Sequence, residues 1–279
     1  MISIIVPANN EEGYIGPCLE FILKSRVPET GTEPVQVIVV ANGCIDTTVT
    51  EARVLIPAFA RKGWQLDVLD LEEGGKIHAL NAGDRAAMHD KRVYIDADIH
   101  VTEGLIAQLA EALDQKPAAY ASGRPQIRLA KSFFSERYAR FWEKTPFMAS
   151  GVPGCGVYSV NAAGRTRWDD FPDITADDIF VRCHFAPDEM HGVPATYSWP
   201  ITEGFGNLVR VRRRQDQGLA QMHKQFSDLA NGMERTAPDG AKTLRLLLQD
   251  PLGFVIYAVV ALTVRLPLFL NRSEWDRGR

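Results

Sequence analysis

Short apolar runs alternate with amphipathic segments through the first hundred residues, and this alternation constrains the fold more than any other feature. Residues 2–6, 35–40, 66–69 and 93–95 are predicted to be strands. Between them, helices are predicted from Ile15 to Leu23, from Val49 to Ala60, and after Gly74. Strands that alternate with helices form a mostly parallel sheet with right-handed crossovers. We therefore expect an α/β domain with helices flanking a central sheet.

Polar residues follow these predicted strands, at the sheet edge where such folds bind ligands. Asp96 and Asp98 are the most informative, because alternation along an extended chain places them on the same side. Two such carboxylates can hold Mg²⁺ or Mn²⁺ while phosphate oxygens complete the shell. The alternative interpretation is an acidic turn in which Asp98 caps a helix that begins near Glu103.

Composition narrows the partners of this 279-residue chain. A net charge of −4 gives no reason to expect nucleic acid as a partner. The four cysteines are scattered without a C-x-x-C pair, so we expect reduced thiols and no zinc site. Met1 leads directly into a short strand and a polar loop, and no signal peptide is expected.

Four motifs, in order, carry a resemblance to a known family. They are Val-Pro-Ala-Asn-Asn-Glu-Glu (6–12), Asn-Gly-Cys-Ile-Asp-Thr-Thr (42–48), Gly-Gly-Lys-Ile-His-Ala-Leu-Asn-Ala-Gly (74–83) and Tyr-Ile-Asp-Ala-Asp (94–98). Together they resemble the inverting GT-A glycosyltransferases of family two. The resemblance implies a GT-A nucleotide-sugar-binding fold. It is close through residue 100 and looser to residue 220.

On the donor side, the resemblance implies that the first loop cradles the nucleotide. That loop contributes Pro7, Asn9 and Glu11. Asn42 stands where the family has a carboxylate that reads the uracil edge, so the identity of the base stays open.

Three further residues complete the implied donor site. Lys76 matches the lysine near the base and the phosphates, and a compact positive charge suits a diphosphate. Asp96 is expected to contact the nucleotide and, with Asp98, the divalent metal. Alone, Asn42 would be a turn residue and Lys76 a solvated lysine.

The acceptor side is expected in the middle of the chain. The glycine-rich stretch 150–159 resembles the family's segment beside the donor sugar, although it would also suit a tight hairpin. Aromatic residues gather between Phe133 and Phe147, where core packing is favoured over an acceptor groove for most of the rings. The predicted catalytic domain is 1–220, with a nucleotide-binding half (1–100) and an acceptor half (101–220).

The segment 174–182 resembles the family's Glu-Asp motif, with Asp in place of Glu at its first position. Inverting transfer needs a base that takes the proton of the acceptor hydroxyl, and a carboxylate at a helix start can do this. The alignment assigns the base to Asp178, and a shift of one position would assign it to Asp177. Helix capping by Thr175 or Asp177 is the structural alternative.

Arginines follow near residue 210. Arg210 and Arg213 match the spacing of a Gln/Arg-x-x-Arg-Trp motif in processive family members, and are expected to neutralise the leaving diphosphate. Arg214 replaces the tryptophan, which argues against a processive synthase. The alternatives are a solvated helix face and a basic patch facing anionic lipid.

The final segment, 221–279, is expected to be helical and apolar. Residues 252–270 are apolar almost throughout but contain Arg265, so spanning a membrane, lying on it and packing on protein all stay open. Arg272, Arg277 and Arg279 follow, which favours an anionic, cytoplasmic membrane face.

These features together indicate a metal-dependent inverting glycosyltransferase. It would move a sugar from a nucleotide-sugar donor to a saccharide or lipid-linked acceptor, in surface polysaccharide or glycolipid synthesis. The expected location is cytoplasmic, at the inner face of the cell membrane. The alternatives are an inactive nucleotide-binding scaffold and a sugar-nucleotide pyrophosphorylase, whose usual glycine-rich phosphate loop is replaced here by Asn9-Asn10-Glu11-Glu12.

Overall fold

A computed structural model describes residues 1–27, 34–114, 117–128, 130–145, 148, 152–231 and 240–266. The chain divides into two compact units, residues 1–126 with 151–199 and residues 127–150 with 200–279. The predicted boundary at residue 220 differs from this division and falls inside one long helix, α10 (Phe205–Gln225).

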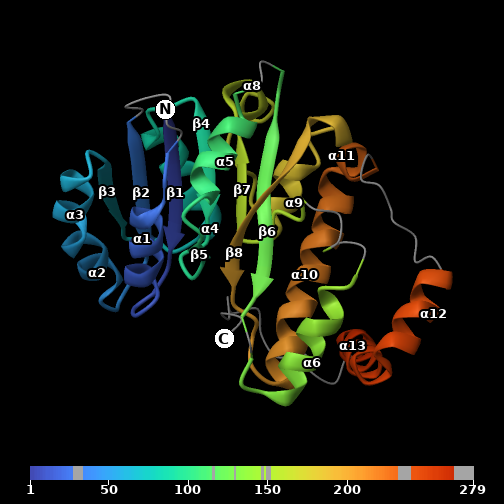
Figure 1. The fold of residues 1–279 in the computed structure, drawn as a ribbon. Coiled ribbons are helices and arrows are strands. Elements are labelled where there is room, and N and C mark those ends of the chain that lie inside the picture. Colours follow the sequence, from blue (N-terminus) through green and yellow to red (C-terminus); the bar gives the residue numbers. More distant parts are fainter. Residues whose placement is uncertain are drawn as a thin grey trace. The chain divides into compact units, whose positions relative to one another are not determined.

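The first unit contains a mixed sheet with flanking helices (Figure 1). Its strands are β1 (Ile2–Ala8), β2 (Val35–Asn42), β3 (Gln65–Leu71), β4 (Lys91–Ile95), β5 (His100–Val101), β6 (Tyr120–Ile127), β7 (Val157–Val160) and β8 (Met190–Trp199). Its helices are α1 (Ile15–Lys24), α2 (Thr48–Val54), α3 (Ile56–Arg61), α4 (Lys76–Ala86), α5 (Leu105–Ala112), α8 (Ala162–Arg165), α9 (Asp177–Arg182) and the 3₁₀ turn η1 (Pro187–Glu189).

The strand order is β3-β2-β1-β4-β7-β6-β8-β5. The first four strands pair in parallel, as the alternating pattern predicted, with Ile4 opposite both Val37 and Val93. Beyond β4 the sheet continues with antiparallel pairs, β4 with β7 and β6 with β7, and β5 pairs antiparallel with β8. The antiparallel half was not anticipated from the sequence.

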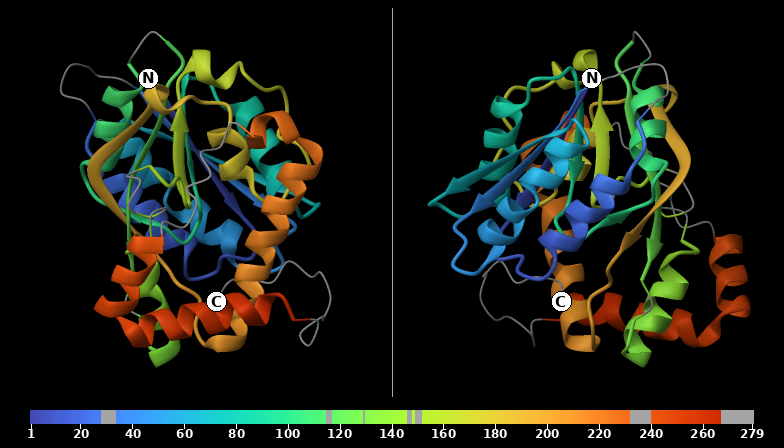
Figure 2. Two further views of the ribbon diagram at one scale, coloured as in Figure 1. Left: turned by 90° about the vertical axis from the view of Figure 1, so that its right-hand side faces the viewer. Right: turned by 60° about the vertical axis from the view of Figure 1, so that its left-hand side comes forward.

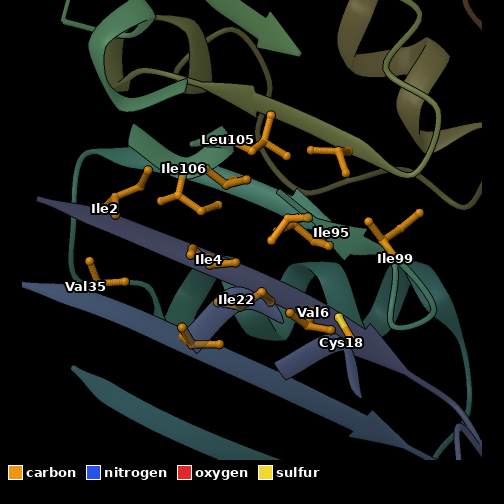
Figure 3. Packing of buried hydrophobic residues seen from close by; sticks show 14 of the residues in the cluster. Ile2, Ile4, Val6, Cys18, Ile22, Val35, Ile95, Ile99, Leu105 and Ile106 are labelled. Atoms are coloured by element: carbon orange, nitrogen blue, oxygen red, sulfur yellow. The ribbon is translucent and has the colours of Figure 1, made fainter. Parts of the chain in front are cut away.

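β1 and β2 are buried on both faces, which explains their apolar sequences, whereas β3 at the edge of the sheet is largely half-buried. Ile4 and Val6 join a core cluster with Cys18, Leu19 and Ile22 of α1 (Figure 3). On the opposite face α4 packs against β1 and β2. A Cβ on Gly83 of α4 would lie 2.5 Å from Ile5 Cγ2, so glycine permits this close helix–sheet contact.

Two local expectations were wrong, each because of a proline. The strand at residue 2 runs through Pro7 to Ala8, because pairing with β4 ends at Ile5 and Pro7 lies opposite Val40 of β2 alone. The helix expected over 49–60 is divided into α2 and α3 at Leu55. Pro57 lies in the first turn of α3, where it cannot donate to the preceding turn.

The second unit is helical. Its helices are α6 (Phe133–Trp142), α10, α11 (Ser227–Asn231), α12 (Gly240–Gln249) and α13 (Pro251–Val264). α13 contacts both α6 and α10 (Figure 2). Tyr138 stacks on Tyr257 with ring centroids 5.3 Å apart, and Phe141 meets both Phe254 and Tyr257. Core packing is therefore confirmed for Tyr138 and Phe141, whereas Phe147 lies outside the described residues.

Candidate functional site

Polar side chains of the first unit tie together the carboxyl ends of β1 and β2 and the start of α4. Asn42 is fully buried, and its Nδ2 donates to the carbonyl oxygens of Ala8 (2.8 Å) and Val40 (3.2 Å). Its Oδ1 accepts from the backbone N–H of Gly75 (2.8 Å), and its own carbonyl accepts from Asn9 Nδ2 (2.5 Å). Both amide hydrogens of Asn42 are thus engaged with backbone, and this side chain joins the ends of β1 and β2 to the start of α4.

The loop after β1 is also tied to the start of α2. The backbone N–H of Glu11 donates to Thr48 Oγ1 (2.6 Å), and that of Glu12 donates to Asp46 Oδ2 (3.1 Å). Asp46 Oδ1 accepts from the Thr48 N–H (3.0 Å), whereas Thr47, the N-cap residue, makes no side-chain cap bond. These contacts hold the predicted nucleotide loop in place.

Lys76 joins two of the predicted site carboxylates. Its Nζ lies 3.0 Å from Asp96 Oδ1, just beyond β4, and 3.0 Å from Asp177 Oδ1 at the start of α9. Burial alone would lower the pKa of Lys76, but the charges of Asp177 and Asp96 raise it, so the ammonium stays charged. The structure thereby brings together residues that stand 101 positions apart in the sequence.

The two adjacent aspartates of α9 have different surroundings. Asp177 is 2% exposed, and its Oδ2 accepts from the Tyr158 hydroxyl (2.9 Å) while its Oδ1 faces Lys76. Asp178 is partly exposed, and its Oδ1 accepts from the N–H of Ile179 (2.8 Å). The N-cap residue of α9 is Ala176, so neither Thr175 nor Asp177 holds the N-cap position.

The electrostatics of the carboxylates reflect their crowding. Burial, and then the neighbouring Asp177 charge, raise the pKa of Asp178 to about 6. Burial also raises the pKa of Asp96, against the opposing effect of Lys76. Carboxyl groups with raised pKa values in one cluster are typical of sites that move protons or bind cations.

Asp96 and Asp98 fit a divalent cation that takes part of its shell from a ligand. Asp96 Oδ2 points toward Gly156, where an added Cβ would lie only 3.4 Å from it, so glycine leaves room beside this oxygen. In the described part of the chain, no three His, Cys, Asp or Glu side chains are grouped to hold a metal. Mg²⁺ is commonly held by one or two carboxylates with phosphates and water, so two aspartates suffice. The helix-cap alternative for Asp98 was wrong, because α5 begins at Leu105 with Gly104 as its N-cap.

The glycine-rich segment lies against this cluster. Gly154 and Gly156 have φ values of +74° and +70°, a backbone region that L side chains rarely adopt. Ser150 and Gly151 lie outside the described residues. β7 follows and carries Tyr158, whose ring stacks on Tyr94 at 4.7 Å. The role of Tyr158 was missed from the sequence, although it stands two residues after Gly156 in a segment already singled out.

Arg210 and Arg213 belong to α10 in the second unit. Arg213 donates to the carbonyl oxygens of Val264 (3.2 Å) and Leu266 (3.1 Å) at the end of α13. Arg210 is exposed and donates to Asn207 on its own helix.

The four cysteines form no disulfide, as expected.

Comparison with known proteins identifies the family of this chain. The sequence profile of glycosyl transferase family 2 matches residues 3–170. A 4,4'-diaponeurosporenoate glycosyltransferase of Staphylococcus aureus (strain MRSA252) is 31% identical over all of this chain and 72% of its own length. The protein of the same name from strain USA300 aligns over 62% of this chain and 43% of its own length.

Solved structures show the same fold. The mannosyltransferase PcManGT of Pyrobaculum calidifontis, in complex with GDP-Man and Mn²⁺, superposes with a TM-score of 0.60 at 20% identity, covering 94% of this chain and 74% of that one. Staphylococcus aureus TarS 1–349 with UDP-GlcNAc has a TM-score of 0.51 at 14% identity, covering 94% and 81%. The architecture is the GT-A fold that the motifs predicted. The chain belongs to glycosyl transferase family 2 and is a glycosyltransferase.

Proposed function

We propose that this glycosyltransferase inverts the anomeric carbon and uses Asp178 as its general base. The observation that carries the proposal is a partly exposed carboxylate whose pKa is raised to about 6, next to the Lys76–Asp96–Asp177 cluster. A base with a pKa near the working pH is ionised often enough to accept a proton and basic enough to hold it. Asp177 is less suited, because Tyr158 and Lys76 already engage both of its oxygens.

In the proposed reaction one bond forms, one bond breaks and one proton moves to a side chain of this protein. The oxygen of the acceptor hydroxyl forms a bond to the anomeric carbon, and its proton passes to the Asp178 carboxylate. The bond from the anomeric carbon to the phosphate oxygen breaks on the opposite face, and the electron pair leaves with the nucleoside diphosphate. Lys76 supplies a positive charge to the donor site, and Asp177 keeps that charge in place.

The donor is a nucleotide sugar, as in the solved relatives with GDP-Man and UDP-GlcNAc. Pro7, Asn9 and Glu11 form the nucleotide loop, and Asn42 acts by bracing it. Asp98 and Asp96 would hold Mg²⁺ or Mn²⁺, which would neutralise charge on the diphosphate. Arg210 and Arg213 remain candidates for stabilising the leaving group.

The acceptor is a saccharide or a lipid-linked molecule, in surface polysaccharide or glycolipid synthesis. The 31%-identical relative is named for transfer involving 4,4'-diaponeurosporenoate. We place the enzyme at the cytoplasmic face of the cell membrane because α13 exposes an apolar stripe. Within the described residues, no helix combines the length and apolar character needed to cross a bilayer.

This stripe is regular. Leu252, Val255, Val259 and Leu262 follow each other at intervals of three and four residues, and each is 44–60% exposed. The opposite side of the helix, with Ile256 and Val260, is buried against α6 and α10. A helix with one packed and one exposed apolar face suits contact with the interfacial layer of a membrane.

The test of the enzymatic proposal measures release of UDP or GDP from nucleotide sugars with Mn²⁺, and formation of UTP or GTP when pyrophosphate is added. Release of a nucleoside diphosphate that requires Asp178, with inverted product stereochemistry by NMR, supports the proposal. An inactive scaffold forms none of these products, whereas a pyrophosphorylase converts the nucleotide sugar and pyrophosphate into a nucleoside triphosphate and a sugar 1-phosphate. Retained anomeric configuration contradicts the inverting mechanism.

Flotation with phosphatidylglycerol vesicles tests the membrane proposal. The full chain should float with vesicles, and Val255→Ser with Val259→Ser should abolish this without unfolding the protein. Val54→Ser with Met88→Ser is the matched control, since these residues of the first unit are 70% and 59% exposed. A full chain that stays unbound contradicts membrane attachment.

A further inference from the structure

Trp199, the last residue of β8, is a partly exposed tryptophan of the first unit. Trp64 and Trp168 of the same unit are buried, at 6% and 7% exposure. The Trp199 side chain packs against the buried core cluster, while part of it stays exposed. An indole that the core supports from one side and solvent reaches from another offers apolar area to a ligand.

Strand pairing carries Trp199 toward the two aspartates of the candidate metal site. β8 pairs antiparallel with β5, where Ser198 lies opposite His100. One residue further along this register, Trp199 is level with Ile99, which directly follows Asp98 in the sequence. The end of β8 therefore runs beside the segment that carries Asp96 and Asp98.

Gly156 lies where the indole and the Asp96 carboxylate come close to each other. A Cβ built on Gly156 would lie 3.3 Å from Trp199 Cδ1, 3.4 Å from Asp96 Oδ2 and 3.0 Å from Ile99 Cδ1. The edge of the indole and the carboxylate oxygen thus both lie within 3.4 Å of one point, which the glycine leaves without a side chain. Gly156 and Asp96 are partly exposed, as Trp199 is, so solvent reaches all three residues.

An indole next to a carboxylate suits a saccharide ring. The C–H groups on one face of a sugar ring are weakly positive and apolar, and they pack on the electron-rich face of an aromatic ring. The proposed donor joins its sugar directly to the diphosphate that the metal at Asp96 and Asp98 would contact. A diphosphate bound there brings the sugar ring into the neighbourhood of Trp199.

We propose that Trp199 is a specificity-determining residue that packs against the sugar ring of the nucleotide-sugar donor. This inference rests on the proposed donor and on the proposed metal site at Asp96. The contact is made by the sugar and not by the nucleoside diphosphate. Trp199 therefore favours the intact donor over the spent nucleotide, and takes no part in bond making or bond breaking.

The test compares the binding of nucleotide sugars with the binding of the matching diphosphates. Calorimetry with Mn²⁺ measures the Kd of UDP-glucose, UDP-N-acetylglucosamine, GDP-mannose, UDP and GDP for the full-length wild type and for Trp199→Ala. For the nucleotide sugar that the wild type binds, Trp199→Ala should weaken binding about tenfold, while the Kd of the diphosphate changes less than about twofold. Trp199→Phe keeps an aromatic ring and should weaken binding of the nucleotide sugar only about threefold.

Selectivity separates this role from a structural one. Because Trp199 packs on the core, Trp199→Ala should lower the Tm, and diphosphate binding shows whether the site survives. If Trp199→Ala does not fold, Trp199→Phe decides by the same comparison. Trp64→Phe is the matched control, since Trp64 packs against Phe59 and Lys62, and it should lower the Tm with every Kd unchanged.

Two results overturn the inference while the proposed donor stands. They are an equal loss of affinity for nucleotide sugar and diphosphate, and unchanged affinity for both in the Trp199 variants. A wild type that binds none of the nucleotide sugars overturns the proposed function and this inference with it.

Discussion

Charged side chains are arranged differently in the two compact units. In the first unit Lys76 and three aspartates gather at the ends of strands, and two of those carboxyl groups have raised pKa values. In the second unit Arg212 and Arg213 are engaged with Asp216, Tyr257 and the last carbonyls of α13. The first arrangement is poised for ligands and protons, whereas the second satisfies helix ends and pairs charges. Substitutions should therefore affect chemistry in one unit and stability in the other.

The largest effect is expected at Asp178. Asp178→Asn preserves shape but cannot take a proton, so kcat should fall by about 10²–10⁴. Thermal shift with donor should show unchanged binding, and Asp188→Asn, an exposed aspartate shortly after α9, is the control. If Asp177→Asn has the larger effect on kcat with binding intact, the two assignments exchange. If neither matters, the base lies elsewhere.

Asp98 should govern metal-dependent binding. Residues that only support metal ligands are worth about 10–100-fold in affinity, so Asp98→Ala should weaken Mn²⁺-dependent binding of UDP or GDP at least tenfold. Calorimetry with Mn²⁺ and with EDTA measures this, and the exposed Asp90→Ala is the control. Affinity that is unchanged in Asp98→Ala rules out the metal role.

Substitution of Arg213 should lower stability, whereas the substitutions of Asp178 and Asp98 should lower turnover and binding. Arg213→Ala removes donors to the carbonyls of Val264 and Leu266, so the free energy of unfolding should fall by about 1–2 kcal/mol. Urea unfolding measures the loss, and Arg210→Ala, which removes a contact within α10, should have a smaller effect. An unchanged stability with a kcat lowered more than tenfold would instead assign Arg213 to the leaving diphosphate.

The contrast also explains what the sequence could predict. The parallel strands could be predicted, because strands buried on both faces have continuous apolar sequences. The polar residues after them could be predicted as binding residues, because ligands bind at the carboxyl ends of parallel strands. Lys76 and Asp96 were predicted in this way, whereas Asp178 was predicted from the resemblance of residues 174–182 to the family's Glu-Asp motif. The antiparallel strands were harder, because the short β7 follows a glycine-rich turn and β5 contains only two residues.

Pairings between distant side chains were beyond the sequence. Asp177 and Asp178 are neighbours in the chain, but successive residues of a helix point in different directions. Only the three-dimensional structure shows that Asp177 accepts a hydrogen bond from Tyr158 and pairs with Lys76. At Asn42, an amide stands where the family has a carboxylate, so the sequence did not identify the nucleotide base. The structure shows that both amide hydrogens of Asn42 bind backbone carbonyl oxygens.

A change in stability similar in size to that of Arg213→Ala, but of opposite sign, is expected at Asp178. Its pKa is raised in the folded protein from 3.8 to about 6, so the ionised carboxylate costs folding free energy at neutral pH. Asp178→Asn should therefore raise the free energy of unfolding at pH 7.5 by about 1–2 kcal/mol, a value reduced for partial exposure. The gain should shrink as the pH falls from 6 and vanish only below about pH 3, where the carboxyl is protonated in both states. Urea unfolding at several pH values checks this, with Asp188→Asn as the flat control. A gain independent of pH would show that shape, and not charge, sets the effect, and a loss would mean that Asp178 stabilises the fold as Arg213 does.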